Sequence, residues 1–506
     1  YSNAGDNSIN IGHSAGYSNS GLDNVCIGHK AGYNGGSKNV KIGFEAGNGG
    51  ANADFNVLIG YKTGYTGNTS DNNTAVGSYA LEAYTEDEAV AFGYEALKAN
   101  TTGTANTAVG YKAGLTATTG HSNSIFGYQA GDAITTGYSN VAIGHSALGA
   151  ATTGYDNIAI GKNTLVAETT GSSNICIGNW AGTGIANAST CNVVIGDQAF
   201  DAQTTGTVSY NTVVGFKALS THNRDAGASA TTAIGALALD QCTTGDRNTA
   251  VGLMASKSLT TGGYNTTLGA YAGEDVTTGS QNVALGFQAG RKGTGSDNCA
   301  IGMYAMECTS SSSGSRNIAI GTRAGQDITT GAYNVILGYD SGLNITTGHT
   351  NVSVGYEAMY NATGAYENVV IGASAGKALT TSTAIWNTLI GVKAGEDMTT
   401  AANNVAIGHQ TMDIVTTGGG NTAVGRECAR SLTTGSNNII LGDSAQPSSA
   451  TVSNEITLGG TGITKFRIPG INFTVKDTTA TEDYVLTVDA NGEAGWEAAG
   501  GTSTGE

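Results

Sequence analysis

The sequence predicts an all-β fold, a parallel β-solenoid of about 27 coils, and three observations lead to it. A motif of the form N-h-x-h-G, with h apolar, returns throughout residues 1–459, as in NVAIGHSAL and NTAVGYKAG. The 506 residues include 78 Gly, 2 Pro and only 12% charged residues, which favours many tight turns between short apolar strands. The sequence nowhere shows the 3.6-residue apolar period of an amphipathic helix.

The glycine that closes the motif serves as position 0 of each coil. It occurs 27 times from Gly12 to Gly459, and 17 of the 26 intervals are 17 residues long. The other intervals run from 15 to 20 residues, and the additions fall in one late loop of the coil. Length variation confined to one place is typical of a surface loop between fixed elements. A repeat of this kind is the sequence signature of a solenoid.

The three residues before position 0 are expected to form a strand. Position −1 is apolar in all 27 coils, and position −3 is mostly Val, Ile or Thr, which suit strands. Position −2 points to the opposite face, where solvent would favour polar residues, yet 22 of 27 are apolar. We therefore expect a strand covered on both faces. Its assigned core residues are Ile143, Ile160, Ile177, Leu337 and Ile371.

Position 0 is expected to turn the chain, either with φ > 0 or because a neighbour lies too close for a Cβ. Positions +1 and +2 vary freely, as an exposed edge would, and +3 is Ala in 21 of 26 coils, which predicts inward packing. This second segment is expected to be a second short strand. The glycines assigned as structural turns are Gly12, Gly28, Gly77, Gly110, Gly144, Gly161, Gly178, Gly252, Gly269, Gly338, Gly372, Gly408 and Gly442.

A loop that often ends in TTG completes the coil, and the Asn three residues later is suited to cap a turn through its side chain. One coil buries about three apolar side chains, which contributes about 5–9 kcal/mol, whereas ordering its backbone costs about 17–34 kcal/mol. Coils must therefore stack, into a rod of roughly 130 Å. The outer strand face needs a cover of equal length, and the simplest cover is another copy of the rod around a cyclic axis.

The N-h-x-h-G-x-x-[A/S] unit resembles the head repeats of YadA-like trimeric autotransporter adhesins and the related repeats of bacteriophage tail and side fibres. The resemblance covers residues 1 to about 459. It implies a homotrimeric, left-handed parallel β-roll. The usual unit of the family is shorter, about 14 residues, so the TTG loop is an elaboration of the outer profile.

Residues 460–506 differ from the repeats and are predicted to form a small β cap with a flexible tail. ITKFRIPG (463–470) alternates as an exposed strand would, and YVLTVDANGEAGWEAA reads as two strands around Asn491-Gly492, a strong hairpin signal. This end is similar, more loosely, to the closing segments of marine phage fibre proteins. Membrane strands of the kind that end an autotransporter are not seen, which favours a viral fibre.

Sharper chemical interpretations fit less well. GHSAG (12–16) matches the G-x-S-x-G nucleophile elbow, but Ser14 occupies the freely varying +2 position, and an elbow needs a following helix with a dedicated His and Asp. The histidines at +1 are expected to be scattered over distant coils as edge residues, so neither a metal nor another cofactor is expected. Most of the seven cysteines are expected to be small core hydrophobes. Net charge is −17 without a basic cluster, which argues against nucleic acid, and no apolar run is long enough to insert in a membrane.

The sequence thus predicts a non-enzymatic fibre shaft, that of a bacteriophage tail or side fibre in a virion, which projects a host-contacting tip or itself mediates attachment to the host surface. Its expected partners are two further copies of itself, other fibre or virion proteins, and a cell-surface receptor or glycan. The alternative is a bacterial surface adhesin or extracellular filament. A minor alternative is an ice-binding solenoid, because successive TTG steps could present an array of threonines.

Overall fold

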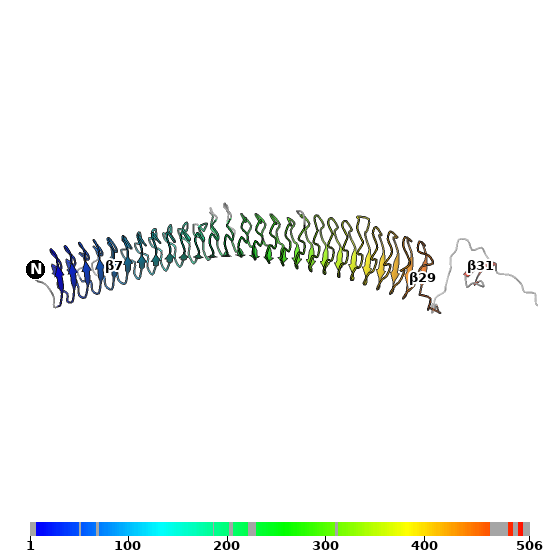
Figure 1. The fold of residues 1–506 in the computed structure, drawn as a ribbon, viewed down its shortest axis with the longest axis horizontal. Helices are drawn as coiled ribbons and strands as arrows, with labels where there is room; N and C mark the ends of the chain where they lie inside the picture. Colours follow the sequence, from blue (N-terminus) through cyan, green and yellow to red (C-terminus); the bar gives the residue numbers. More distant parts are fainter. Residues whose placement is uncertain are drawn as a thin grey trace, which may run out of the picture. The chain divides into compact units, whose positions relative to one another are not determined.

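The chain is described by a computed structural model, which covers residues 7–49, 52–66, 70–185, 187–201, 206–220, 229–308, 312–465, 484–488 and 494–498. Successive coils of residues 7–460 stack along one axis, each contributing one three-residue strand to the same side (Figure 1). The strands are β1 (Ile9–Ile11), β3 (Val25–Ile27), β5 (Val40–Ile42), β6 (Val57–Ile59), β7 (Thr74–Val76), β8 (Val90–Phe92), β9 (Thr107–Val109), β10 (Ser124–Phe126), β11 (Val141–Ile143), β12 (Ile158–Ile160), β13 (Ile175–Ile177), β14 (Val193–Ile195), β15 (Thr212–Val214), β16 (Thr232–Ile234), β17 (Thr249–Val251), β18 (Thr266–Leu268), β19 (Val283–Leu285), β20 (Cys299–Ile301), β21 (Ile318–Ile320), β22 (Val335–Leu337), β23 (Val352–Val354), β24 (Val369–Ile371), β25 (Thr388–Ile390), β26 (Val405–Ile407), β27 (Thr422–Val424), β28 (Ile439–Leu441) and β29 (Ile456–Leu458).

These elements form a single 27-stranded parallel sheet in which each strand pairs with the same positions of the next coil. Between β11 and β12, for example, Ala142 lies opposite Ala159 and Ile143 opposite Ile160. The prediction of an all-β parallel solenoid with a repeat of about 17 residues is confirmed. Parallel pairing follows from the chain going once around the coil between strands.

The second segment, expected to be a second strand, is instead a run of turns. Outside the main sheet and the C-terminal hairpin, the described residues form only the short pair β2 (Ser18–Asn19) and β4 (Asn34–Gly35) and three isolated bridges. The reason is the backbone at +2, where Lys30 has φ +51° and interrupts an extended conformation. The segment still connects coils, because the Lys30 N–H donates to the His13 carbonyl at 2.9 Å.

The interior is narrow and filled from two sides of the coil. The −2 side chain of the strand and the +3 alanine both point inward, as Ala142 and Ala147 do with no exposed surface. A large residue then fills the remaining space, either at +4, as Leu148 does, or at −2 or +7 when +4 is glycine. Gly131 is such a case, since Ile125 and Ile134 flank it.

The C-terminal unit comprises Thr461–Glu506, and the repeats comprise Tyr1–Gly460. In the former, β30 (Tyr484–Val488) pairs antiparallel with β31 (Ala494–Ala498), with Val488 opposite Ala494. The expected hairpin around Asn491-Gly492 therefore has its two strands, and the turn itself lies outside the described residues. Most of the expected strand at 463–470 and the expected flexible tail also lie outside them.

Candidate interaction surfaces

The turn glycines all have a backbone conformation that favours glycine. Across the thirteen assigned positions φ lies between +131° and +143°. In every one except Gly442, a Cβ would lie closer than 3.0 Å to the carbonyl oxygen of the next turn glycine; at Gly161 that neighbour is Gly178. Both reasons expected from the sequence, positive φ and close approach, therefore apply at the same position.

The strand residues assigned to the core lie on the outside of the single chain, which corrects that assignment. Ile143 and Ile371 are 38% and 37% exposed, whereas the −2 residues beside them, Ala142 and Val370, are fully buried. Ile160, Ile177 and Leu337 occupy the same outward column and are partly exposed. Sequence reasoning recognised two apolar faces but did not identify the inner one. The small size of most −2 residues was the available signal, since the interior is narrow and accepts a large −2 residue mainly where +4 is glycine.

The outward columns at −3 and −1 form a continuous, predominantly apolar surface, here called the sheet face. In all 27 strands position −1 is Ile, Val, Leu or Phe, and position −3 is Val, Ile, Thr, Ser or Cys. No charged side chain occupies either column over the 27 described strands. With strands about 4.8 Å apart and about 10 Å wide, the sheet face covers about 1,300 Å². Exposed apolar patches of this size are typical of interaction sites in proteins.

The asparagines at position −4 form a buried ladder that connects the coils, whereas the sequence predicted only that each would cap a turn of its own coil. The Asn157 Nδ2 donates to Asn140 Oδ1 at 3.2 Å and to the Gly171 carbonyl at 2.9 Å. Its Oδ1 in turn accepts from the backbone N–H of Asn174 at 3.0 Å. The side chain therefore links three coils rather than capping only its own turn. The ladder is interrupted at Ala89 and Thr231.

Threonine columns follow the TTG steps. The Thr135 hydroxyl donates to the Thr152 carbonyl at 3.0 Å, and Thr152 donates to Thr169 at 3.2 Å. In most of the described steps the first threonine thus uses its hydroxyl proton within the stack, while the second, such as Thr153, is exposed. A two-column threonine array with free hydroxyl donors, as an ice-binding surface would favour, is therefore not what these steps present.

The +1 positions of the first nine coils carry an exposed column of stacked rings. His13 and His29 lie on consecutive coils with ring centroids 5.2 Å apart, which corrects the expectation that these histidines are scattered. The column continues through Phe44 and Tyr61. Where Ser78 leaves a gap, Tyr79 from +2 fills it with edge contacts to the rings on both sides.

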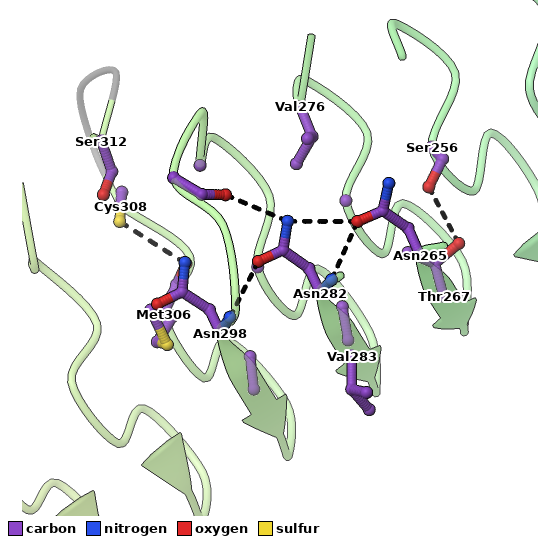
Figure 2. A pocket seen from close by; sticks show the side chains of 16 residues that line it. Ser256, Asn265, Thr267, Val276, Asn282, Val283, Asn298, Met306, Cys308 and Ser312 are labelled. Atoms are coloured by element: carbon purple, nitrogen blue, oxygen red, sulfur yellow. Dashed lines mark hydrogen bonds between the residues drawn. The ribbon is translucent and has the colours of Figure 1, made fainter. Parts of the chain in front are cut away.

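One interior cavity of about 30 Å³ lies between β18 and β20 (Figure 2). It arises because Gly290 at +4 is flanked only by Ala284 and Ala300, and the shortened loop places Gly293 where other coils have a large +7 residue. On one side the Ser256 and Thr267 hydroxyls bond each other at 2.9 Å. Burial raises the pKa of the Cys308 thiol, on the other side, to about 11. The cavity is a packing defect of water size rather than a ligand pocket.

Lys41 is the largest polar side chain in the interior. It occupies a −2 position, is 1% exposed, and its amine lies 3.5 Å from the Asn34 carbonyl. Burial lowers the pKa of this amine, because the charged form loses its hydration. The stem crosses the space left by glycines at +4 of two successive coils, Gly32 and Gly47. The lysine is therefore explained by the space that these glycines leave for a long side chain, and not by a reactive role of its amine.

Ser14 has φ +57° in a turn, and its hydroxyl lies 3.1 Å from His13 Nδ1 on the exposed surface. A histidine and a neighbouring serine make a similar contact at a different coil position, between His121 and Ser122, so this contact does not distinguish Ser14 as a nucleophile. Cys26 and Cys176 are buried as expected, whereas Cys299 is partly exposed on the sheet face and Cys191 is exposed.

In the described ranges no three His, Cys, Asp or Glu side chains gather as metal ligands would. The same residues include no helix that is long and apolar enough to cross a bilayer.

Neither a model of a known protein family nor a curated protein matches the chain.

Proposed function

We propose that the chain is the shaft of a homotrimeric fibre that projects, or itself makes, a contact with a cell surface. The observation that carries this proposal is the sheet face, which is predominantly apolar and without charge along 27 strands. A stable interface hides about 800 Å² on each partner, and the sheet face offers about 1,300 Å². Burial of its Ile, Val and Leu side chains provides the driving force.

A second copy of the same chain is the partner that matches this surface. A cover must repeat every 4.8 Å over 27 coils, and an identical rod has that repeat by construction. Three copies, rather than two, are proposed because the repeat resembles trimeric head repeats, and because parallel rods around a cyclic axis form a closed assembly. The left-handed roll and the capping role of residues 460–506 belong to the same proposal.

We propose that the fibre is a tail or side fibre of a virion. The alternative is that the same shaft belongs to a bacterial surface adhesin or extracellular filament. Rigidity supports either: backbone hydrogen bonds, the asparagine ladder and the threonine columns all run from coil to coil. A stack of coils linked in this way is stiff enough to hold a binding site at a distance from its point of attachment. The exposed +1 and loop residues, which vary between coils, are where other fibre proteins, a receptor or a glycan would bind.

The proposal is tested by placing a charge on the sheet face. Ile143→Lys and Ile177→Lys together put two ammonium groups per chain into the proposed interface, while each coil interior keeps its packing. We expect the full chain to sediment as a trimer and the double variant as a monomer with an unchanged β circular dichroism spectrum. Thr153→Lys, an exposed loop position, is the matched control and should remain trimeric. A wild-type monomer, or a double variant that still forms trimers, would overturn the proposal.

A further inference from the structure

We infer that a slot between Tyr33 and Tyr65 binds one acidic sugar ring of a surface polysaccharide. The site deepens the surface contact of the proposed function, on which it rests, but every residue of it comes from one chain. It lies at position +5, where the second segment passes into the loop. A hollow of about 480 Å³ is present there.

The slot is a missing member of a ring column. Position +5 of the first coils holds Tyr17, Tyr33, Asn48 and Tyr65 in order. The Tyr17 and Tyr33 rings stack with centroids 5.1 Å apart and planes 14° from parallel. Two coils therefore separate Tyr33 from Tyr65 by about 10 Å, with only the short Asn48 side chain between them.

The gap in this column remains open, in contrast to the one at +1. There, the ring of Tyr79 enters the space left by Ser78 and touches both neighbouring rings. At +5 the residue after Asn48 is Gly49, which has no side chain and forms part of the lining of the hollow. A six-membered ring midway between the tyrosines would lie about 5 Å from each centroid, within the range of ring contacts.

Polar groups at the rim of the slot favour a sugar ring over an aromatic ring as the bound ligand. Lys30 and Asn34 line the hollow beside the two tyrosines, and the Asn34 amide donates to the Asn48 carbonyl at 3.3 Å. A sugar ring places its C–H faces on the aromatic walls and its hydroxyls at the edge, where these polar groups lie. A flat aromatic compound without polar substituents would contact the walls but form no hydrogen bond with the rim.

The charge beside the slot favours an acidic sugar. Glu45 lies between two lysines, 4.0 Å from the Lys30 amine and 3.8 Å from that of Lys62. The Lys62 amine also lies 4.9 Å from the centre of the Tyr65 ring. Two cations against one anion leave a local positive charge on a chain whose net charge is −17. A carboxylate on the sugar is the substituent that this edge attracts.

The test titrates the full-length chain with trisaccharides of galacturonate, glucuronate and mannuronate, with their neutral counterparts, and with benzoate, by isothermal calorimetry and ligand-observed NMR. We expect at least one uronate trisaccharide to bind more tightly than its neutral counterpart. Asn48→Tyr completes the ring column and should weaken binding about tenfold or more, as should Tyr65→Ala, which removes a wall. Lys30→Gln should reduce the preference for the acidic sugar.

Tyr138→Ala is the matched control, because Tyr138 stacks between His121 and Tyr155 in a column without a gap, and it should leave binding unchanged within about twofold. Absence of binding by every uronate, equal binding by Asn48→Tyr, or binding of benzoate alone would overturn the inference. Each variant is also sedimented, so that loss of sugar binding with an intact trimer separates this site from the fibre proposal.

Discussion

Gly161→Ala adds a single methyl group where the position 0 glycines of two successive coils lie close together. The backbone φ there is +135°, a region that is nearly restricted to glycine and costs about 1–3 kcal/mol for other residues. The new Cβ would also lie closer than 3.0 Å to the Gly178 carbonyl oxygen and to Thr164 Oγ1. Backbone must therefore move, and we expect a total cost of roughly 2–4 kcal/mol for local opening of these coils.

Hydrogen exchange followed by mass spectrometry measures this cost where it arises, because a stack of coils does not unfold as one cooperative unit. Amides of β12 and β13 should exchange about 30- to 1,000-fold faster in the variant, at about 1.4 kcal/mol per factor of ten. Amides of β27, far along the stack, should not change. Gly149→Ala is the matched control, since its Cβ would meet no atom closer than 3.3 Å and its φ is not positive. Equal exchange in Gly161→Ala and Gly149→Ala would refute the assignment of position 0 as an obligatory glycine turn.

Three further predictions concern the interior. Thr231→Asn should slow amide hydrogen exchange in β16 by about fivefold or more. The asparagine closes a gap in the ladder and replaces a hydroxyl that is buried without a partner. Unchanged exchange would mean that the ladder contributes nothing at this coil. Ala284→Val should fill the cavity and stabilise its coils by up to about 1 kcal/mol. Ala142→Val, in a coil already filled by Leu148, should instead destabilise its coils by about 1–3 kcal/mol. A change in stability of the same sign for both variants would contradict this account of the packing. Lys41 has a folded pKa below its unfolded value of about 10.4, so the folded state binds fewer protons between these two values and local stability should fall as pH drops from about 10.4 to the folded pKa. Lys41→Met should abolish that dependence in exchange rates of β5, corrected for intrinsic chemistry, and a pH dependence that persists would show another group to be responsible.

The sequence was sufficient for the repeat, the strand and the turn, because each is tied to one coil position. Gly161 could only be a turn residue, and the apolar residues before it could only be a strand. It was not sufficient to distinguish inside from outside, since Ala142 and Ile143 are both apolar and only the closure of the coil decides between them. The second strand was predicted wrongly because +2 accepts Lys30, Glu45 and many other residues despite φ > 0, so free variation concealed a fixed backbone.

Interactions between coils were the least predictable part of the candidate surfaces. Asn157 is an ordinary turn residue within its own coil, and its role depends on Asn140 and Asn174, which are 17 residues away in either direction. The aromatic slot is of the same kind: Tyr33, Asn48 and Tyr65 become neighbours only when the coils are placed in register. Comparing one position across successive coils, rather than residues along the chain, is the signal that finds both.

The central claim is that the sheet face is covered by two further copies of the chain. Sedimentation equilibrium of the full-length protein, over a concentration range that extends to nanomolar, measures this most directly. One chain has a mass of 50.7 kDa, so a trimer has three times that mass, about 150 kDa. We expect about 150 kDa at every concentration, and a constant 50.7 kDa would contradict the claim.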